Sequence, residues 1–340
     1  MQKLEQCLNQ ILSDKIADNI AVKVGKNDNT FCEIYRSNTQ TIDAHTLFDM
    51  ASVTKILATT SLCLIALDRE LIDLNTKVSR FFHCEEGKQD MTVSNLLTHT
   101  MGIANKPLYR PEVSYDNVAE HILSIPSDVP IGREVLYSCP GFILLGKILE
   151  KVFGERLDAL LERYVCAPLE MTATGFCPRD KSNIVNSNAT NDMLGIVNDY
   201  NCRHLGGVTG NAGIFSNMND LTKYVNMLLS YGEPIISEKT FRNSIKNHTA
   251  QMSASRGLGF LYVDDRYEQT GKLFSSGSFG HCGHTGQSIF VDNESGLYVI
   301  ILSDATITVQ KKYGRENYGE VIAMRTAIHN AIAADLRETN

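Results

Sequence analysis

Ser52 and Lys55 lie three residues apart in the segment 48–55, at the start of an apolar run that extends to residue 67. Ala, Leu and Ile dominate this run and no Gly or Pro interrupts it, which predicts one helix from Ala51 onward. Residues at this spacing share a helix face, so the hydroxyl and the amine should be in contact. An amine held neutral by burial can take the proton of a serine that attacks a carbonyl. The pair predicts a nucleophilic serine, although a serine that only caps a helix has the same signature.

A tyrosine follows at position 137, on the turn that starts an amphipathic helix predicted for residues 142–152. The apolar residues of this helix recur at helical spacing and are expected in the core: Leu144, Leu145, Ile148 and Leu149. A side chain on the preceding turn can project into a cleft, so Tyr137 is a candidate partner of Ser52. The alternative is a half-buried tyrosine with a solvated hydroxyl.

The third candidate stretch is the glycine-rich segment 280–287, which leads into a predicted strand. Glycines let the backbone approach a ligand closely, and the N–H of Gln287 at the strand edge could donate to an oxyanion. His281, Cys282 and His284 raise the alternative of a metal site. Their spacing matches no standard zinc pattern, so we expect no metal or other cofactor, and a plain β-bulge with exposed histidines is the stronger alternative.

Composition narrows the class of protein. The chain has 340 residues, of which 43% are hydrophobic and 21% charged, as is usual for a globular protein of one large or two interlocked domains. Its net charge of −7 argues against a nucleic-acid or anionic-membrane surface. We therefore expect neither of these partners, and the oligomeric state is left open.

The N-terminus and the cysteines indicate the compartment. Residues 1–12 are charged and place Leu4, Leu8 and Ile11 on one helical face, so they predict an amphipathic helix and no signal peptide. No apolar run elsewhere is expected to cross a bilayer. The nine cysteines show no C-x-x-C spacing and are expected to be free thiols. We predict a cytoplasmic protein, with a trimmed export signal as the alternative.

Both ends of the chain carry strand patterns, with helical patterns between them. A hairpin is predicted from residues 19–24 and 30–35, and further strands from 257–263, 279–280, 287–292 and 297–303. An amphipathic helix is predicted for 318–336. We therefore expect residues 1–60 and 256–340 to form one α/β sheet domain. Residues 61–255 would be an inserted, mainly helical subdomain, with the site at the seam.

Three short motifs occur in this order: Ser52-Val53-Thr54-Lys55, Tyr137-Ser138-Cys139 and His284-Thr285-Gly286. They resemble the three boxes of the serine β-lactamase and penicillin-binding-protein superfamily, and most closely its class C β-lactamase-like branch of carboxypeptidases, D-aminopeptidases and esterases. Residues 96–102 and 205–216 resemble framework motifs of that branch. The resemblance runs from about residue 10 to the end. It implies an α+β fold of the β-lactamase/transpeptidase type, an antiparallel sheet flanked by the N- and C-terminal helices.

The resemblance also implies a mechanism. Ser52 would form an acyl-enzyme, with Lys55 and the Tyr137 phenolate sharing the role of general base. The backbone N–H groups of Ser52 and Gln287 would form the oxyanion hole. His284 would take the place of the lysine that β-lactamases commonly carry in the third box, and would support the Tyr137 proton relay or hold a substrate carboxylate.

Cys139, Thr285 and Gly286 are the substrate-binding candidates that the resemblance adds. Cys139 departs from the family pattern, in which an asparagine usually ends the second box, and a thiol is only a weak donor and acceptor. This departure puts recognition of a β-lactam or of a peptide amide in doubt. His99 is expected to tie down its own loop through hydrogen bonds, and not to act as a base.

We therefore predict a serine hydrolase that cleaves a small ester or amide. The alternatives within the same fold are a D-amino-acid peptidase or carboxypeptidase, a β-lactamase and an acyltransferase. An alternative of another class is a catalytically weak protein that senses a ligand in the same cleft. Retention of Ser52, Lys55 and Tyr137 argues against that last alternative, whereas Cys139 argues for it.

Overall fold

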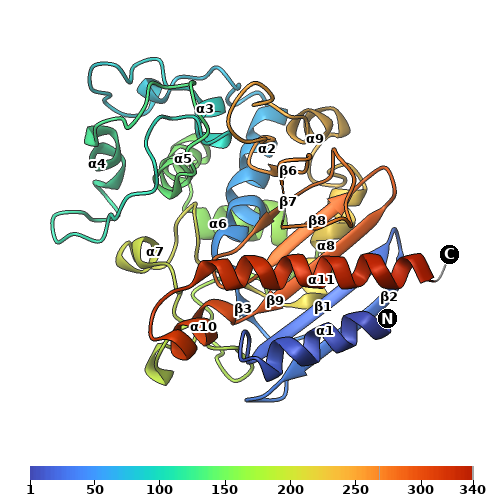
Figure 1. Ribbon diagram of the computed structural model, residues 1–340. Coiled ribbons are helices and arrows are strands. Elements are labelled where there is room, and N and C mark those ends of the chain that lie inside the picture. Colours follow the sequence, from blue (N-terminus) through green and yellow to red (C-terminus); the bar gives the residue numbers. More distant parts are fainter. Residues whose placement is uncertain (268, 339–340) are drawn as a thin grey trace.

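A six-stranded antiparallel sheet organises the molecule (Figure 1), and the computed structural model describes residues 1–267 and 269–338. Its strand order is β2-β1-β9-β8-β7-β6. The strands are β1 (Asn19–Lys26), β2 (Asn29–Ser37), β6 (Leu261–Tyr262), β7 (Phe279–Cys282), β8 (Ser288–Asp292) and β9 (Leu297–Ser303). A small second sheet consists of β3 (Phe48–Asp49), β5 (Ile214–Ser216) and β4 (Gly175–Phe176). The two chain ends thus share one sheet, as the strand patterns predict.

Two hydrophobic cores lie on the two faces of this sheet. Along β9, Val299 and Ile301 belong to one core, and Ile300 and Leu302 belong to the other. Side chains alternate across a strand, so a run that is apolar at every position must be covered on both faces. Helices α1 (Gln2–Ser13) and α11 (Tyr318–Glu338) lie side by side over one face (Figure 1). Helix α8 (Met218–Leu229) packs on β8 and β9.

The helical part of the chain gathers at one end of the sheet, with α3, α4 and α5 away from it (Figure 1). The remaining α-helices are α2 (Ser61–Asp68), α3 (Val93–Leu97), α4 (Val118–Ser124), α5 (Cys139–Phe153), α6 (Leu157–Leu161), α7 (Tyr200–His204), α9 (Glu238–Ser244) and α10 (Ala305–Tyr313). Short 3₁₀ or π turns are η1 (Ala51–Val53), η2 (Lys55–Thr60), η3 (Val78–Arg80), η4 (Glu162–Cys166) and η5 (Asn191–Met193). The division into a sheet domain and an inserted subdomain stays a prediction.

The helix predicted from Ala51 onward is present, but its hydrogen-bonding pattern changes along its length. It begins as the 3₁₀ turn η1, widens into the π-helical segment η2 and ends as α2. Among the described residues, Ala51–Asp68 is the one helical stretch long and apolar enough to cross a membrane, and 83% of it is buried inside the fold. This burial is the pattern of a core helix. A cytoplasmic location stays a prediction.

Most predicted elements of the sheet are confirmed, with one wrong strand. The hairpin, β8, β9 and the C-terminal helix lie where the patterns place them. The strand predicted for 257–263 is wrong for all but Leu261–Tyr262. The N–H of Gly257 bonds to the carbonyl of Phe260, and that of Gly259 to the carbonyl of Leu97. These N–H groups are used in a turn and a loop contact, and so cannot join the sheet. Helix α10 has no counterpart among the predicted elements.

Candidate active site

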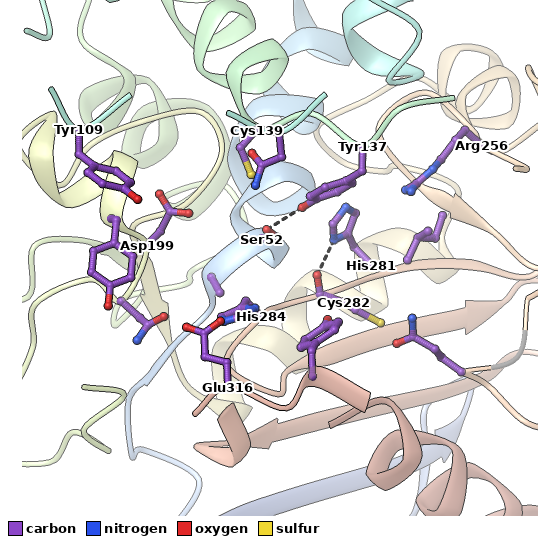
Figure 2. Close-up of a pocket in the computed structure, with 17 residues that line it drawn as sticks. Ser52, Tyr109, Tyr137, Cys139, Asp199, Arg256, His281, Cys282, His284 and Glu316 are labelled. Carbon is purple, nitrogen blue, oxygen red and sulfur yellow. Dashed lines mark hydrogen bonds between the residues drawn. The ribbon is translucent and has the colours of Figure 1, made fainter. Parts of the chain in front are cut away.

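Ser52 lies on the floor of a cleft and its hydroxyl is the meeting point of two other side chains (Figure 2). The Lys55 ammonium donates to Ser52 Oγ at 2.9 Å, and the Tyr137 hydroxyl donates to the same oxygen at 2.7 Å. The contact predicted from helical spacing is present. The structure also brings Tyr137, at the start of α5, to the serine from a separate part of the chain.

The Lys55 side chain is fully buried beneath Ser52. Its Nζ also donates to the carbonyl of Asn211 at 3.0 Å and lies 3.5 Å from the Cys139 sulfur. Burial by itself lowers the pKa of Lys55, but the neighbouring Cys139 and Tyr137 outweigh burial and leave this pKa above its ordinary value. The amine is therefore held protonated, which differs from the neutral amine expected from burial alone.

Tyr137 has one part of its ring open to the cleft and its hydroxyl end enclosed against Ser52 and Lys55. Burial raises the pKa of Tyr137 to about 12, although the Lys55 charge acts in the opposite direction. The ring packs on His99 with centroids 4.7 Å apart. His99 Nδ1 in turn accepts the N–H of Ser138 at 3.0 Å. His99 thus links the Tyr137 loop to its own loop through this hydrogen bond.

Cys139 lies at the first turn of α5 with its thiol buried at the edge of the cleft. Burial is the main effect on this thiol and raises its pKa, while Lys55 lowers it. Its sulfur offers the Lys55 ammonium only a weak hydrogen-bond acceptor. All nine cysteines of the chain are free.

Asp49 is buried and forms hydrogen bonds with three separate segments of the chain next to the cleft. Its carboxylate accepts the N–H of Ala51 at 2.9 Å and the N–H of Asn198 at 2.7 Å. Its backbone carbonyl accepts the Thr285 hydroxyl at 3.0 Å and the Gln287 side-chain amide at 2.6 Å. Ala51 has a φ of 44°, a left-handed value that costs energy in a residue with a Cβ. Asp49 therefore stabilises the turn that presents Ser52. No pattern in the sequence singled it out.

Thr285, Gly286 and Gln287 do not line the cleft that contains Ser52. The first and last are buried against Asp49, and the Gly286 backbone packs on the Ser303 side chain. The Thr285 and Gln287 side chains thus hold the backbone of Asp49 in place. A role of Thr285 and Gly286 in substrate binding, and of the Gln287 N–H in an oxyanion hole, stays a prediction.

The cleft wall is lined by His281, Cys282 and His284 instead. The imidazole next to Tyr137 is that of His281, with ring centroids 6.4 Å apart. The His284 ring stacks on the Tyr318 ring with centroids 5.2 Å apart, and burial lowers the pKa of His284. The motif Gly-His-x-Gly occurs twice in overlapping registers, at 280–283 and 283–286. The sequence analysis assigned His284 of the second copy to the site. In the structure, strand β7 places His281 of the first copy next to Tyr137.

Gly283 joins these two copies and touches the nucleophile turn. A Cβ at this position would lie 2.7 Å from the Met50 carbonyl oxygen and 3.4 Å from the Ala51 Cβ, so the backbones are in close contact. Within the described part of the chain, the N–H groups of Ser52 and His284 donate no hydrogen bond. Each of these two residues directly follows a residue of this contact, Ala51 or Gly283.

A family model described as Beta-lactamase matches residues 5–321. The chain belongs to the beta-lactamase family. The predicted resemblance is thereby confirmed, and the protein is a serine hydrolase of the β-lactamase-like type. The chain is 26% identical over 301 residues to an N-acetylmuramyl-L-alanine amidase of Bacillus subtilis, covering 76% of this chain and 68% of that one. It is 27% identical over 305 residues to a protein of Escherichia coli K12 named "Putative D-alanyl-D-alanine carboxypeptidase", with 76% and 69% covered.

Solved structures support the fold of this beta-lactamase-family chain. EstCE1, described as a hydrolase with promiscuous acyltransferase activity, superposes with a TM-score of 0.75 at 18% identity, covering 96% of this chain and 98% of that one. An octameric penicillin-binding protein homologue from Pyrococcus abyssi has a TM-score of 0.74 at 18% identity, with 93% and 78% covered. At these identities the likeness concerns the fold, and it confirms the predicted α+β architecture.

The cleft of this beta-lactamase-family hydrolase has a volume of about 610 Å³ and opposite charges at its two ends. Asp199 and Glu316 lie on the side of Tyr109, and Arg256 lies beyond Tyr137 on the other side (Figure 2). Ser52 lies between them. Among the described residues, no three or more His, Cys, Asp or Glu side chains are grouped to hold a metal ion.

Proposed function

We propose that the protein cleaves a small ester or amide through an acyl-enzyme formed on Ser52. The observation that carries the proposal is the pair of hydrogen bonds that Ser52 Oγ receives from Lys55 and Tyr137. A serine hydroxyl is a weak nucleophile unless a positioned group removes its proton. Ser52 has two such groups within hydrogen-bond distance and faces a cleft.

The proton of Ser52 passes to the Tyr137 oxygen during attack. The active form of the Lys55–Tyr137 pair has one proton fewer than the resting form, and is best described as a phenolate beside an ammonium. The Ser52 oxygen bonds to the substrate carbonyl carbon, and the bond from this carbon to the leaving group then breaks. Tyr137 returns the proton to the leaving oxygen or nitrogen. Water, activated by the same pair, attacks the acyl-enzyme and releases the acid and Ser52.

The negative charge on the carbonyl oxygen needs donors that are already in place. We assign this role to the backbone N–H groups of Ser52 and His284. The close contact of Gly283 with the nucleophile turn supports this pairing. His284 replaces Gln287 in this role, because Gln287 lies outside the cleft lining.

The names of the relatives support the reaction class but do not identify the leaving group of the substrate. Their names include an amidase, a carboxypeptidase and a hydrolase with promiscuous acyltransferase activity. Hydrolysis of an ester needs less leaving-group assistance than that of an amide. The weak polarity of Cys139 at the cleft edge therefore favours an ester over a peptide or β-lactam amide.

Intact-protein mass spectrometry tests the proposal. The protein is incubated with an activated ester, a fluorophosphonate and a penicillin, and compared with Ser52→Ala and, as a control, Ser79→Ala, which removes an exposed hydroxyl outside the cleft. We expect an adduct with the ester or the phosphonate in the wild type and in Ser79→Ala, and none in Ser52→Ala. Penicillin labelling would favour the penicillin-recognising alternative. Folded wild-type protein that forms no adduct with any probe would overturn the covalent mechanism in favour of ligand sensing.

A further inference from the structure

Arg325 is a fully buried arginine on α11 that contacts the turn following β7. Its Nη2 donates to the carbonyl of Gly283, and its Nε donates to the carbonyl of Gly286 at 3.3 Å. Its Nη1 donates to the Gln269 side-chain oxygen at 3.0 Å and to the Tyr318 hydroxyl at 3.1 Å. These four acceptors are neutral, and two of them belong to the backbone of one turn.

These contacts differ from those of Arg256, the arginine that lines the cleft. Arg256 Nε and Nη1 have no hydrogen-bond partner among the described residues. The Arg325 guanidinium is instead bonded to main-chain carbonyls, and Arg325 lies outside the cleft lining. A buried charge has to be satisfied by hydrogen bonds, and here the backbone supplies them. Arg325 therefore acts on the protein itself and is not placed to touch a substrate.

The turn that Arg325 contacts is tight. The N–H of Gly286 donates to the Gly283 carbonyl at 3.2 Å, and the N–H of Gly283 donates to the Gln287 carbonyl at 2.8 Å. The Thr306 hydroxyl donates to the His284 carbonyl. The N–H of His284 donates no hydrogen bond within residues 1–267 and 269–338. The turn thus fixes its carbonyls and leaves this one N–H to an acceptor from outside.

The Gly283 carbonyl and the His284 N–H belong to the same peptide group. A peptide group is planar and nearly always trans, so its C=O and N–H point in opposite directions. Because Arg325 holds the carbonyl, the N–H points away from Arg325. His284 lines the cleft, and Gly283 contacts the nucleophile turn. Rotation of this peptide would exchange the carbonyl and the N–H, and a glycine without a Cβ resists such a rotation little.

We infer that Arg325 is a positioning residue that holds the peptide group between Gly283 and His284 with its N–H toward the carbonyl oxygen of the substrate. This inference rests on the proposed acyl-enzyme function, in which the His284 N–H stabilises the oxyanion. A hydrogen bond from a charged donor is stronger than a neutral one, and it polarises the peptide so that the N–H donates more strongly. A donor fixed in advance costs no reorganisation during the reaction.

Two other roles of Arg325 lead to different expectations. A purely structural role, in which Arg325 only fastens α11 to the sheet, would change the reaction of all substrates alike. An electrostatic role would change the reaction of anionic substrates only. The charge does reach the cleft wall: burial lowers the pKa of His284, and the Arg325 charge acts in the same direction. The test therefore has to separate three roles.

Two pairs of esters separate them. The neutral pair is phenyl acetate and O-phenyl thionoacetate, and the anionic pair is 3-acetoxybenzoate and its thiono analogue. In the thiono compounds sulfur replaces the carbonyl oxygen, and the sulfur anion that develops is larger and a weaker hydrogen-bond acceptor. The kcat/KM of each compound is divided by its rate constant with hydroxide. The oxygen-to-sulfur ratio of these values then reports on the oxyanion hole.

Three variants are compared with wild type: Arg325→Met, Arg325→Lys and His329→Gln. Methionine fills part of the same space and removes the charge and the donors. His329 provides a matched control, because it is buried one turn further along α11 and its Nδ1 lies 3.1 Å from the Gln269 carbonyl. The hydrogen bonds of its side chain to described residues do not involve the turn at 283–286.

We expect wild type to favour the oxygen esters about 100-fold in both pairs. Arg325→Met should lower this ratio about tenfold or more, through a loss of kcat/KM for the oxygen esters, and leave the thiono esters within about 3-fold. Arg325→Lys should keep part of the ratio, because an ammonium keeps the charge but loses the fork that bonds two carbonyls. His329→Gln should lower the Tm and keep the wild-type ratio.

Equal losses for oxygen and thiono esters would overturn the inference in favour of a structural role, and a loss confined to the anionic pair would favour an electrostatic one. A wild-type ratio near one, or an unchanged ratio in Arg325→Met, would also overturn it. If Arg325→Met does not fold, Arg325→Lys decides, and a ratio equal to that of wild type overturns the inference. A folded wild type that is acylated by no ester or phosphonate refutes the proposed function. An acylated wild type with any of the other adverse outcomes refutes this inference alone.

Discussion

The two sides of the Tyr137 ring differ in how their buried polar groups are satisfied. Toward Ser52, the lysine, the serine and the tyrosine bond to one another, and Asp49 ties the backbone that carries them. Toward Arg256, its Nε and Nη1 and the Nε2 of His281 are buried and have no hydrogen-bond partner among the described residues. Groups bonded to one another hold a fixed geometry without ligand, whereas unpaired groups gain their partner only when a ligand binds. The Ser52 side carries the groups of the proposed reaction, and the Arg256 side has buried nitrogens left to bind a partner.

Lys55→Met should give the largest effect and should act on neutral and anionic esters equally. It removes the ammonium from Ser52 Oγ and Tyr137 but keeps the volume, so kcat should fall about 1,000-fold for every ester. Steady-state kinetics on both ester pairs measures this. Lys77→Met removes an exposed ion pair with Asp90 and should leave kcat unchanged. A loss confined to anionic esters would show that Lys55 recognises the substrate. It would contradict a role of Lys55 in chemistry common to all substrates.

Asp49→Asn should lower kcat about 10-fold to 100-fold, again for all substrates. A carboxylate accepts from both Ala51 and Asn198, whereas an amide must turn its NH₂ toward one of these two N–H groups. The Ser52 turn then shifts, and small displacements of reacting groups are costly. The control is Asp43→Asn, an acceptor in an exposed turn. A change in KM with kcat intact would show that Asp49 holds a binding wall and not the nucleophile.

The pH dependence should identify the Lys55–Tyr137 pair as the base for neutral and anionic esters alike. Both pKa values are raised above their ordinary values, so the pair holds both protons at neutral pH. The active form has lost one, so kcat/KM should rise about tenfold per pH unit through neutrality and level off only in alkaline solution. Burial also raises the pKa of Asp49 to about 6, so its protonation should steepen the fall below that pH. A plateau that begins below pH 7 would contradict this assignment.

Cys139→Ala should have the smallest effect on the Ser52 side. The thiol lies 3.5 Å from Lys55 Nζ, while Ser52 and Asn211 make the stronger contacts with that ammonium. We expect kcat/KM within about 3-fold of wild type on both members of each ester pair. A loss above tenfold would make Cys139 part of the proton path. A loss confined to the anionic pair would extend the recognition site across Tyr137.

Elements governed by neighbours in the chain could be predicted from the sequence. The contact between Ser52 and Lys55 follows from helical hydrogen bonding, which places residues three apart on one face. The hairpin of β1 and β2 and the strand β9 follow from alternation and from apolar runs in the same way. The family motifs added Tyr137. Sequence spacing alone could not predict that Tyr137 lies beside Ser52.

Contacts between distant segments were decided only by the folded chain. The overlapping motifs at 280–286 are equivalent locally and both reach the cleft, but the pairing of β7 with β8 places the His281 ring of the first one next to Tyr137. Asp49 meets Thr285 across 236 positions of sequence, so no local pattern marks it. The protonation of Lys55 and the unpaired charge of Arg256 also depend on which side chains surround them after folding. Local geometry decides which groups can touch within an element, and packing decides which elements meet and how they are charged.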